Sequence, residues 1–190
     1  MSDKKVHELR EPFTKEKIKA YRAGETVLVT GIIYTARDAA HKRITEMISL
    51  GENPPFEIAN SIIYYVGPTP AKPGQAIGSA GPTTSYRMDA YAPVMLNLGQ
   101  LAMIGKGQRS QEVMDAVIKN SAVYMAATGG AAALMAKQIK KAEVIAFDDL
   151  GAEAVRKLYV EDFPLTVVLD SAGGNLYKQG REDYLKSLEK

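Results

Sequence analysis

Residues 98–127 read LGQLAMIGKGQRSQEVMDAVIKNSAVYMAA, and this stretch decides the fold. The apolar run at 98–104 is typical of a buried strand, and Ser110 is placed to cap a helix whose apolar residues recur at helical spacing. A second apolar run at 122–127 predicts another strand. Strand and helix therefore alternate here, which is typical of an α/β domain with parallel strands.

The sequence before this stretch predicts two more strands and one more helix. The β-branched run at 27–34 predicts a strand, and 61–66 predicts another. Between them, an apolar stripe at helical spacing predicts a helix that Asp38 caps and that ends at Gly51. Residues 1–24 are rich in charged side chains, so we expect an N-terminal arm with a short helix there.

The sequence after residue 127 continues the same alternation. Thr128-Gly129-Gly130 opens an alanine-rich helix that extends to about Lys140, and a closing helix begins near Gly180. Further strands are predicted near 144–147, 157–160 and 165–169. Because no internal repeat or linker divides the chain, we expect one α/β domain over residues 1–190 with parallel and antiparallel strands.

One long loop interrupts this pattern, at residues 67–82. The segment is rich in proline and glycine, which exclude a helix or a central strand. Long loops inside compact domains are often functional. We therefore expect part of a site at or beside this loop.

Composition excludes several classes of protein. The net charge of +2, from 24 Lys and Arg against 22 Asp and Glu, is too small for a protein that binds nucleic acid or a membrane surface through its overall charge. The chain has no cysteine, so it can form neither a disulfide nor a thiolate metal site. It shows neither an apolar run long enough to span a membrane nor an N-terminal signal peptide, which predicts a cytoplasmic protein.

Familiar catalytic motifs are also absent from the sequence. It contains no GxSxG nucleophile elbow, no HExxH and no EF-hand loop, and its two histidines, His7 and His41, offer little for a metal site. The segment Gly105-Lys106-Gly107 lacks the first glycine and the Ser or Thr of a nucleotide-binding P-loop. These observations exclude the common hydrolase triads, zinc enzymes and P-loop proteins.

The remaining polar residues favour an anion site. Arg37 lies between a strand end and a helix start, where open α/β sheets commonly bind ligands, and its planar guanidinium matches a carboxylate. The segment 78–89 adds small residues, the hydroxyls of Thr83 and Thr84, and Arg87. Together with Lys106, the two arginines predict a local cationic site.

Simpler interpretations of the same residues remain open. The segment 78–89 could form a turn followed by a Thr or Ser helix cap, Asp38 could serve only as a cap, and His41 could be a packed or solvated histidine. The backbone at Thr128-Gly129-Gly130 could bind an anion or could serve only for close packing of a helix on a strand.

A resemblance to a known family is carried by five ordered blocks. The chain is similar to the β subunit, equivalently the C-terminal domain, of the iron-sulfur hydro-lyases that include class I fumarate hydratase and L(+)-tartrate dehydratase. The blocks are Thr30-Gly31 with 36–43 (ARDAAHKR), 63–70 (IYYVGPTP), 81–84 (GPTT) with 87–89 (RMD), 104–107 (IGKG), and 153–154 with 161–164 (EDFP). Ser85-Tyr86 stands where small residues are usual in the family.

The resemblance implies a fold, a cofactor and a partner. The fold is a swivelling β/β/α domain of three layers with mixed sheets, which closes over a four-iron four-sulfur (4Fe-4S) cluster held by three cysteines of an α subunit. The chain would then hold no metal itself, which agrees with its lack of cysteine. The expected assembly is a hetero-oligomer such as α2β2, active only with the α subunit, without nucleic acid or membrane.

The resemblance also implies roles for individual residues. An open iron of the cluster acts as a Lewis acid on a small dicarboxylate with a 2-hydroxyl group. Arg37, Arg87 and Lys106, with Thr84, bind the carboxylates, and Arg37 and its cationic neighbours stabilise the charge that develops when a carbon loses its proton. Thr83 is the candidate base, activated by nearby cations, while Asp38 and His41 support Arg37 or contact the α subunit.

Three functions are weighed on this basis. The first is the reversible hydration of fumarate to malate, and the second is the dehydration of L(+)-tartrate to oxaloacetate. No residue in the chain separates these two substrates. The third is a dicarboxylate-binding module that uses the same Arg/Lys site without catalysis.

Overall fold

The computed structural model describes residues 5–127 and 132–188. Its strands and helices follow one another in chain order as β1 (Val6–Arg10), α1 (Lys15–Ile18), β2 (Thr26–Thr35), α2 (Asp38–Ser49), β3 (Ile62–Tyr64), η1 (Ser85–Met88), α3 (Ala92–Asn97), β4 (Ala102–Gly105), α4 (Gln111–Asn120), β5 (Val123–Ala126), α5 (Ala132–Gln138), β6 (Ile139–Ala146), η2 (Asp148–Glu153), β7 (Val155–Leu169) and α6 (Leu176–Leu188).

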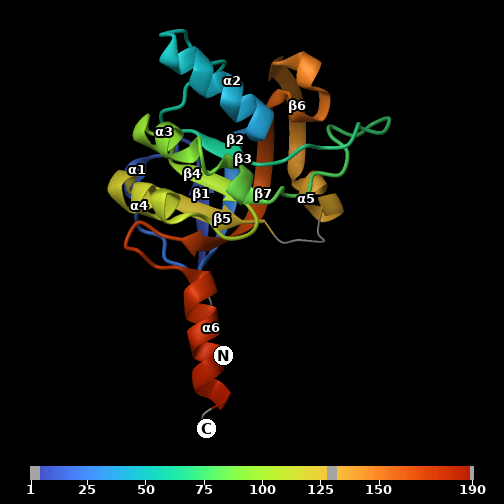
Figure 1. The fold of residues 1–190 in the computed structure, drawn as a ribbon. Coiled ribbons are helices and arrows are strands. Elements are labelled where there is room, and N and C mark those ends of the chain that lie inside the picture. Colours follow the sequence, from blue (N-terminus) through green and yellow to red (C-terminus); the bar gives the residue numbers. More distant parts are fainter. Residues whose placement is uncertain (1–4, 128–131, 189–190) are drawn as a thin grey trace.

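The described strands form one mixed sheet in the order β1-β2-β3-β4-β5-β7-β6. Strands β1 to β5 run parallel to their neighbours, whereas β7 is antiparallel to β2, β5 and β6. Because β7 pairs with both β5 and β2, the strands β2, β3, β4, β5 and β7 close into a ring (Figure 1). The predicted α/β class with parallel and antiparallel strands is therefore confirmed.

Strand β7 joins two strands that the sequence predicted separately. It runs without interruption from Val155 to Leu169 and pairs with nearly the whole of β2. Residues 161 and 162 together lie opposite the single residue Thr30, and the amide of Asp162 donates to the Thr30 hydroxyl at 2.9 Å. Residues 161 and 162 therefore form a β-bulge within the single strand β7 and not a turn between two strands.

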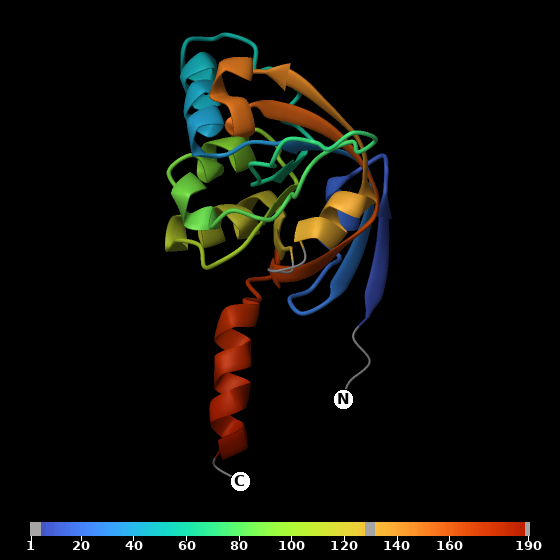
Figure 2. The same ribbon diagram turned by 90° about the vertical axis from the view of Figure 1, so that its right-hand side faces the viewer.

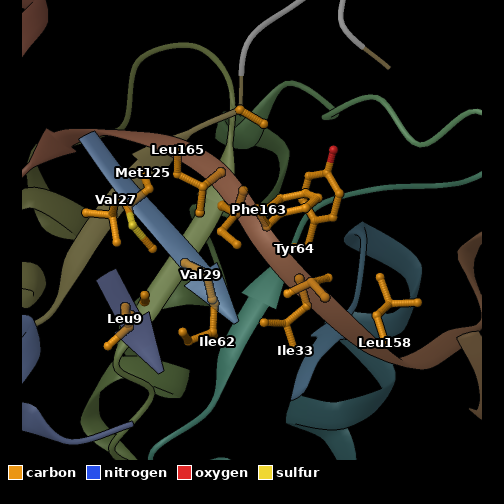
Figure 3. Packing of buried hydrophobic residues seen from close by; sticks show 14 of the residues in the cluster. Leu9, Val27, Val29, Ile33, Ile62, Tyr64, Met125, Leu158, Phe163 and Leu165 are labelled. Carbon is orange, nitrogen blue, oxygen red and sulfur yellow. The ribbon is translucent and has the colours of Figure 1, made fainter. Parts of the chain in front are cut away.

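The inside of this ring is filled by apolar side chains. Along β2, buried and half-buried residues alternate, so every second side chain points inward. Figure 3 shows the result: Val29, Ile33, Tyr64 and Phe163 meet from three strands. The Tyr64 and Phe163 rings are in edge contact, with centroids 5.5 Å apart.

The outer face of the parallel strands is covered by helices. Side chains of α2, α3 and α4 pack there with strand residues such as Ile63 and Met103 in a second buried cluster. Figure 2 shows these helices on one side of the sheet and the strands folded over on the other, which gives two β layers and one α layer. Helix α6 extends away from this body in both views (Figures 1 and 2).

Several local predictions are corrected by the structure. Residues 6–10, which we expected in an arm, form β1, because this strand pairs with the first half of β2. The strand predicted at 98–104 begins only at Ala102. Residues 92–97 before it form helix α3, with a proline in its first turn, where a missing amide hydrogen costs no bond. The segment Thr128-Gly129-Gly130 lies outside the described residues. No described helix has the length and apolar character needed to span a membrane.

Candidate functional site

The predicted cationic residues lie at one edge of the sheet, at the carboxyl ends of its parallel strands. Arg37 follows β2, residues 65–67 follow β3, and Lys106 follows β4. Strands β2, β3 and β4 are neighbours, so these three positions lie side by side. This is the edge at which open α/β sheets bind ligands.

The end of the long loop crosses this edge as an extended segment. The amide of Thr83 donates to the carbonyl of Tyr65 at 2.7 Å, and the amide of Ser85 donates to the carbonyl of Lys106 at 2.8 Å. Thr84 lies between them and forms an isolated parallel bridge with Lys106. The structure thus brings Thr83 and Thr84 to the same edge as Lys106.

The hydroxyls of Thr83 and Thr84 are not used by the fold. Thr84 occupies the N-cap position of η1, but no side-chain cap bond forms there. Neither threonine hydroxyl has a hydrogen-bond partner among the described residues, and both side chains are half-buried. Neither hydroxyl therefore makes a cap bond, although Thr84 stands at a cap position, and both hydroxyls remain available for a ligand.

The guanidinium of Arg37 is held at this edge by two contacts. Its Nη2 atom lies 3.0 Å from the Glu153 carboxylate at the end of η2. Its side chain also lies against Gly67, where an added Cβ would come within 2.7 Å of Arg37 Nη1 and would displace the guanidinium. Only 19% of the Arg37 side chain is exposed, and its buried Nε atom has no hydrogen-bond partner among the described residues.

Asp38 connects the two arginines and does not cap the helix. Its Oδ2 atom lies 2.7 Å from Arg87 Nη2, and its Oδ1 atom lies 3.9 Å from Arg37 Nε. The N-cap position of α2 is Arg37, and Asp38 is the first helical residue. The predicted cap is corrected because the carboxylate turns toward Arg87, while its negative charge still lies favourably at the helix start. Lys106, an exposed residue, adds a third positive charge.

His41 lies beneath Arg37 and is fully buried. Its Nδ1 donates to the Arg37 carbonyl at 2.9 Å, so Nδ1 carries the proton and the buried Nε2 is left without a bonded partner among the described residues. The ring packs against Tyr65 and Tyr91. Burial, which disfavours the charged form, lowers the pKa of His41 from 6.5 to about 4. His41 is thus a packed residue that also holds the backbone of Arg37.

This burial predicts a pH dependence of stability. Between pH 6.5 and about 4 the unfolded chain binds a proton at His41 that the folded chain does not. The free energy of unfolding should therefore fall as the pH falls through this window, by up to about 1.4 kcal/mol per pH unit. His41→Asn keeps a donor for the Arg37 carbonyl but does not titrate, so urea unfolding should show a shallower slope for this variant. Equal slopes in the two proteins would contradict the prediction.

Three contributors to this edge were not assigned by the sequence: Glu153, Gly67 and Ser85. All three lie in or beside the quoted family blocks, but nothing in the sequence shows that Glu153 meets Arg37 across more than a hundred residues. Ser85 is buried and bonds to the Tyr124 hydroxyl at 2.9 Å. Arg87 and Lys106 are exposed, so this part of the edge is accessible to solvent.

The fold and this edge define a class of protein: an α/β domain that presents three cations and two free hydroxyls at the carboxyl ends of parallel strands. Comparison with known proteins gives the family. Residues 1–180 match the family described as Fumarase C-terminus, and the chain belongs to that family.

Individual relatives agree with this assignment. The chain is 40% identical over 176 residues to fumarate hydratase 2 of Leishmania major, and 39% identical over 165 residues to the anaerobic class I fumarate hydratase of Escherichia coli K12. These matches cover 90% and 86% of the chain but only 31% and 30% of the relatives, so the chain spans about a third of their length.

A third relative has nearly the same extent as this chain. The chain is 39% identical over 181 residues to a protein of Methanocaldococcus jannaschii provisionally named L(+)-tartrate dehydratase subunit beta. That match covers 92% of the chain and 93% of the relative. The family therefore includes chains of this size as well as longer proteins.

Proposed function

We propose that this chain is the β part of an iron-sulfur-dependent hydro-lyase that hydrates fumarate reversibly to malate. One observation carries the proposal: Arg37, Arg87, Lys106 and the free hydroxyl of Thr83 gather at the carboxyl edge of the parallel strands. A dicarboxylate needs two cationic contacts and a group that takes a proton from carbon, and this edge offers both.

The cluster that the family implies does not fit the residues of this chain. The sequence has no cysteine, and the described residues include no group of three or more His, Asp or Glu that could hold a metal ion. We therefore assign the 4Fe-4S cluster to a partner α subunit, whose surface would cover the open edge.

The residues of this chain would act on the dicarboxylate in two ways. Arg37 and Arg87 each have donors that Glu153 and Asp38 leave free, so they can bind carboxylate oxygens and keep the substrate in one orientation. The Thr83 oxygen would take the proton from the carbon next to a carboxylate, and the charge that moves onto that carboxylate would be stabilised by the arginines and Lys106. A threonine hydroxyl is a weak base, so nearby positive charge must lower its pKa.

Replacement of either arginine by lysine tests the carboxylate contacts. Arg37→Lys or Arg87→Lys keeps the charge but loses the paired donors, so kcat/KM should fall at least about tenfold, or ~1.5 kcal/mol. The free energy of unfolding should change by less than about 1 kcal/mol, because these ion pairs are partly exposed. The measurement is steady-state kinetics of the assembled enzyme together with urea unfolding.

Arg43→Lys is the matched control for these variants. Arg43 is 40% exposed, as Arg87 is, and pairs with Asp149, which is not one of the predicted site residues. It should retain full activity. Arginine variants at 37 or 87 that are unstable but fully active would show that these residues are structural.

A second candidate substrate, L(+)-tartrate, is favoured by the relative of matching length. The test for both substrates is copurification of this chain with an α-type chain that carries three cysteines, followed by assays with malate, fumarate and tartrate. Turnover of malate supports the proposal, and turnover of tartrate alone supports the second candidate. A stable chain that binds dicarboxylates but assembles with no such partner would indicate a non-catalytic binding module.

A further inference from the structure

A buried arginine that the proposed function does not use lies directly behind the site. The side chain of Arg109 is fully buried, and its Nε donates to the Asp89 carboxylate at 2.7 Å. The other Asp89 oxygen accepts from the amide of Ser110, the N-cap of α4, at 2.6 Å. Asp89 therefore fixes the guanidinium of Arg109 to the start of a packed helix.

This guanidinium lies over two tyrosine rings. Its central carbon is 5.4 Å from the ring centroid of Tyr65 and 5.0 Å from that of Tyr124. Such cation–π contacts are strongest where water is excluded, as it is around this side chain. Arg109 thus contacts both tyrosines: Tyr65, which follows β3, and Tyr124, the second residue of β5.

Both tyrosines hold the backbone of the site. The carbonyl of Tyr65 accepts from the amide of Thr83 at 2.7 Å. The hydroxyl of Tyr124 bonds to the Ser85 hydroxyl and donates to the Gly107 carbonyl, each at 2.9 Å. Ser85 and Gly107, the residues after Thr84 and Lys106, are therefore both bonded to the Tyr124 side chain, and Thr83 is bonded to the backbone of Tyr65.

Ser85 completes the connection between the two segments. Its hydroxyl accepts from the amide of Lys106 at 3.1 Å, while its own amide donates to the Lys106 carbonyl at 2.8 Å. An added Cβ at Gly105 would overlap the Ser85 hydroxyl, so this close approach requires glycine.

Stability alone is a poor explanation for this arrangement. A buried ion pair must overcome the cost of removing both charges from water, and apolar residues of similar volume often replace such a pair without loss of stability. What the charged pair supplies is defined geometry: a planar guanidinium with one orientation between two rings.

We propose that Arg109, held by Asp89, is a positioning residue that acts through Tyr124 to align Thr83 with Lys106. The inference rests on the proposed function for its kinetic consequence, but the alignment itself can be measured without turnover. A misplacement of reacting groups by about 1 Å can lower a rate by up to ~10²-fold, so loss of this alignment should affect kcat more than KM.

The test uses Tyr124→Phe and Arg109→Lys in the full chain assembled with its partner. Tyr124→Phe keeps the ring under Arg109 and removes only the hydroxyl that bonds to Ser85 and Gly107. Amide hydrogen exchange at Ser85 and Lys106 should accelerate at least about tenfold, the factor expected for loss of a supporting hydrogen bond. kcat should fall about tenfold with KM nearly unchanged.

Tyr21→Phe is the matched control. Tyr21 is also buried, but it precedes β2 at the opposite end of the parallel strands and contacts His7. It should change neither exchange at Ser85 and Lys106 nor kcat. If Arg109→Lys fails to fold, Tyr124→Phe decides the question on its own.

The outcomes separate this inference from the proposed function. Unchanged exchange at Ser85 and Lys106 in a folded Tyr124→Phe variant overturns the inference, and so does faster exchange with full kcat. If the parent complex turns over none of the substrates, the proposed function fails. In that case faster exchange at both amides still supports the alignment role.

Discussion

The chain purified alone should fold, contain no iron-sulfur cluster and have no hydratase activity until a cluster-loaded α subunit is added. Thiolates are the usual ligands of such clusters, and this chain has none. Two cations of its site, Arg87 and Lys106, are exposed, so substrate bound there would remain in contact with water. Activity should therefore rise from zero with added α subunit and saturate at a fixed ratio of the two chains.

The measurement combines iron and sulfide analysis with a titration of the α subunit. Circular dichroism of the isolated chain provides the control for folding. Stoichiometric iron and sulfide in the folded chain alone would refute the division of roles between the subunits. Malate dehydration by the isolated chain would refute it as well.

Elements with a clear local signal were predicted well from the sequence. The strand at 27–34 and the helix that follows it are confirmed as β2 and α2. A strand that buries alternate residues and a helix that buries one face each produce a characteristic spacing of apolar residues in the sequence. The helix that Ser110 caps is also confirmed: its hydroxyl accepts from the amide of Val113.

Features that depend on pairing between distant segments were not predicted. The strand formed by residues 6–10 has few apolar residues and gains its partner only when β2 is in place. The two predicted strands near 157–160 and 165–169 are one strand, because the bulge at Asp162 is stabilised by Thr30 on a different strand. The sheet closes into a ring because β7 pairs with both β5 and β2, and no local sequence pattern indicates this double pairing.

The site residues likewise include some that the sequence could place and others that depend on contacts between distant segments. Arg37 and Lys106 could be placed because each directly follows a predicted strand, where ligands are commonly bound. The pairing of Asp38 with Arg87, and that of Arg37 with Glu153, requires the folded arrangement of three separate segments. The buried Arg109 could not be recognised, because arginines are usually exposed and its sequence neighbours are polar.

Thr83→Val should lower kcat by ~10² or more in the assembled enzyme, with little change in KM. The variant keeps the shape of the side chain and removes only the hydroxyl, which has no bonded partner among the described residues and so contributes little to the fold. Because the Thr83 amide remains bonded to Tyr65, the backbone should not move. Thr83→Ser, which keeps a hydroxyl at the same place, should retain part of the activity.

The assay is steady-state malate dehydration under anaerobic conditions, with cluster content measured in every variant. Thr26→Val is the matched control, because Thr26 is half-buried at the start of β2, at the other end of the strand from Arg37. It should turn over at the parent rate, which would show that loss of a half-buried threonine hydroxyl is harmless elsewhere in the sheet.

The rate of Thr83→Val decides where the base lies. If this variant keeps more than about a third of the parent rate at equal cluster content, the group that takes the proton belongs to the α subunit. The cations of this chain would then bind the carboxylates while the partner carries out proton transfer. If the rate falls as expected while Thr83→Ser remains partly active, the hydroxyl oxygen itself is required. Lys106, which is bridged to the neighbouring Thr84 at the same edge, would then help to activate so weak a base, because a positive charge stabilises the alkoxide.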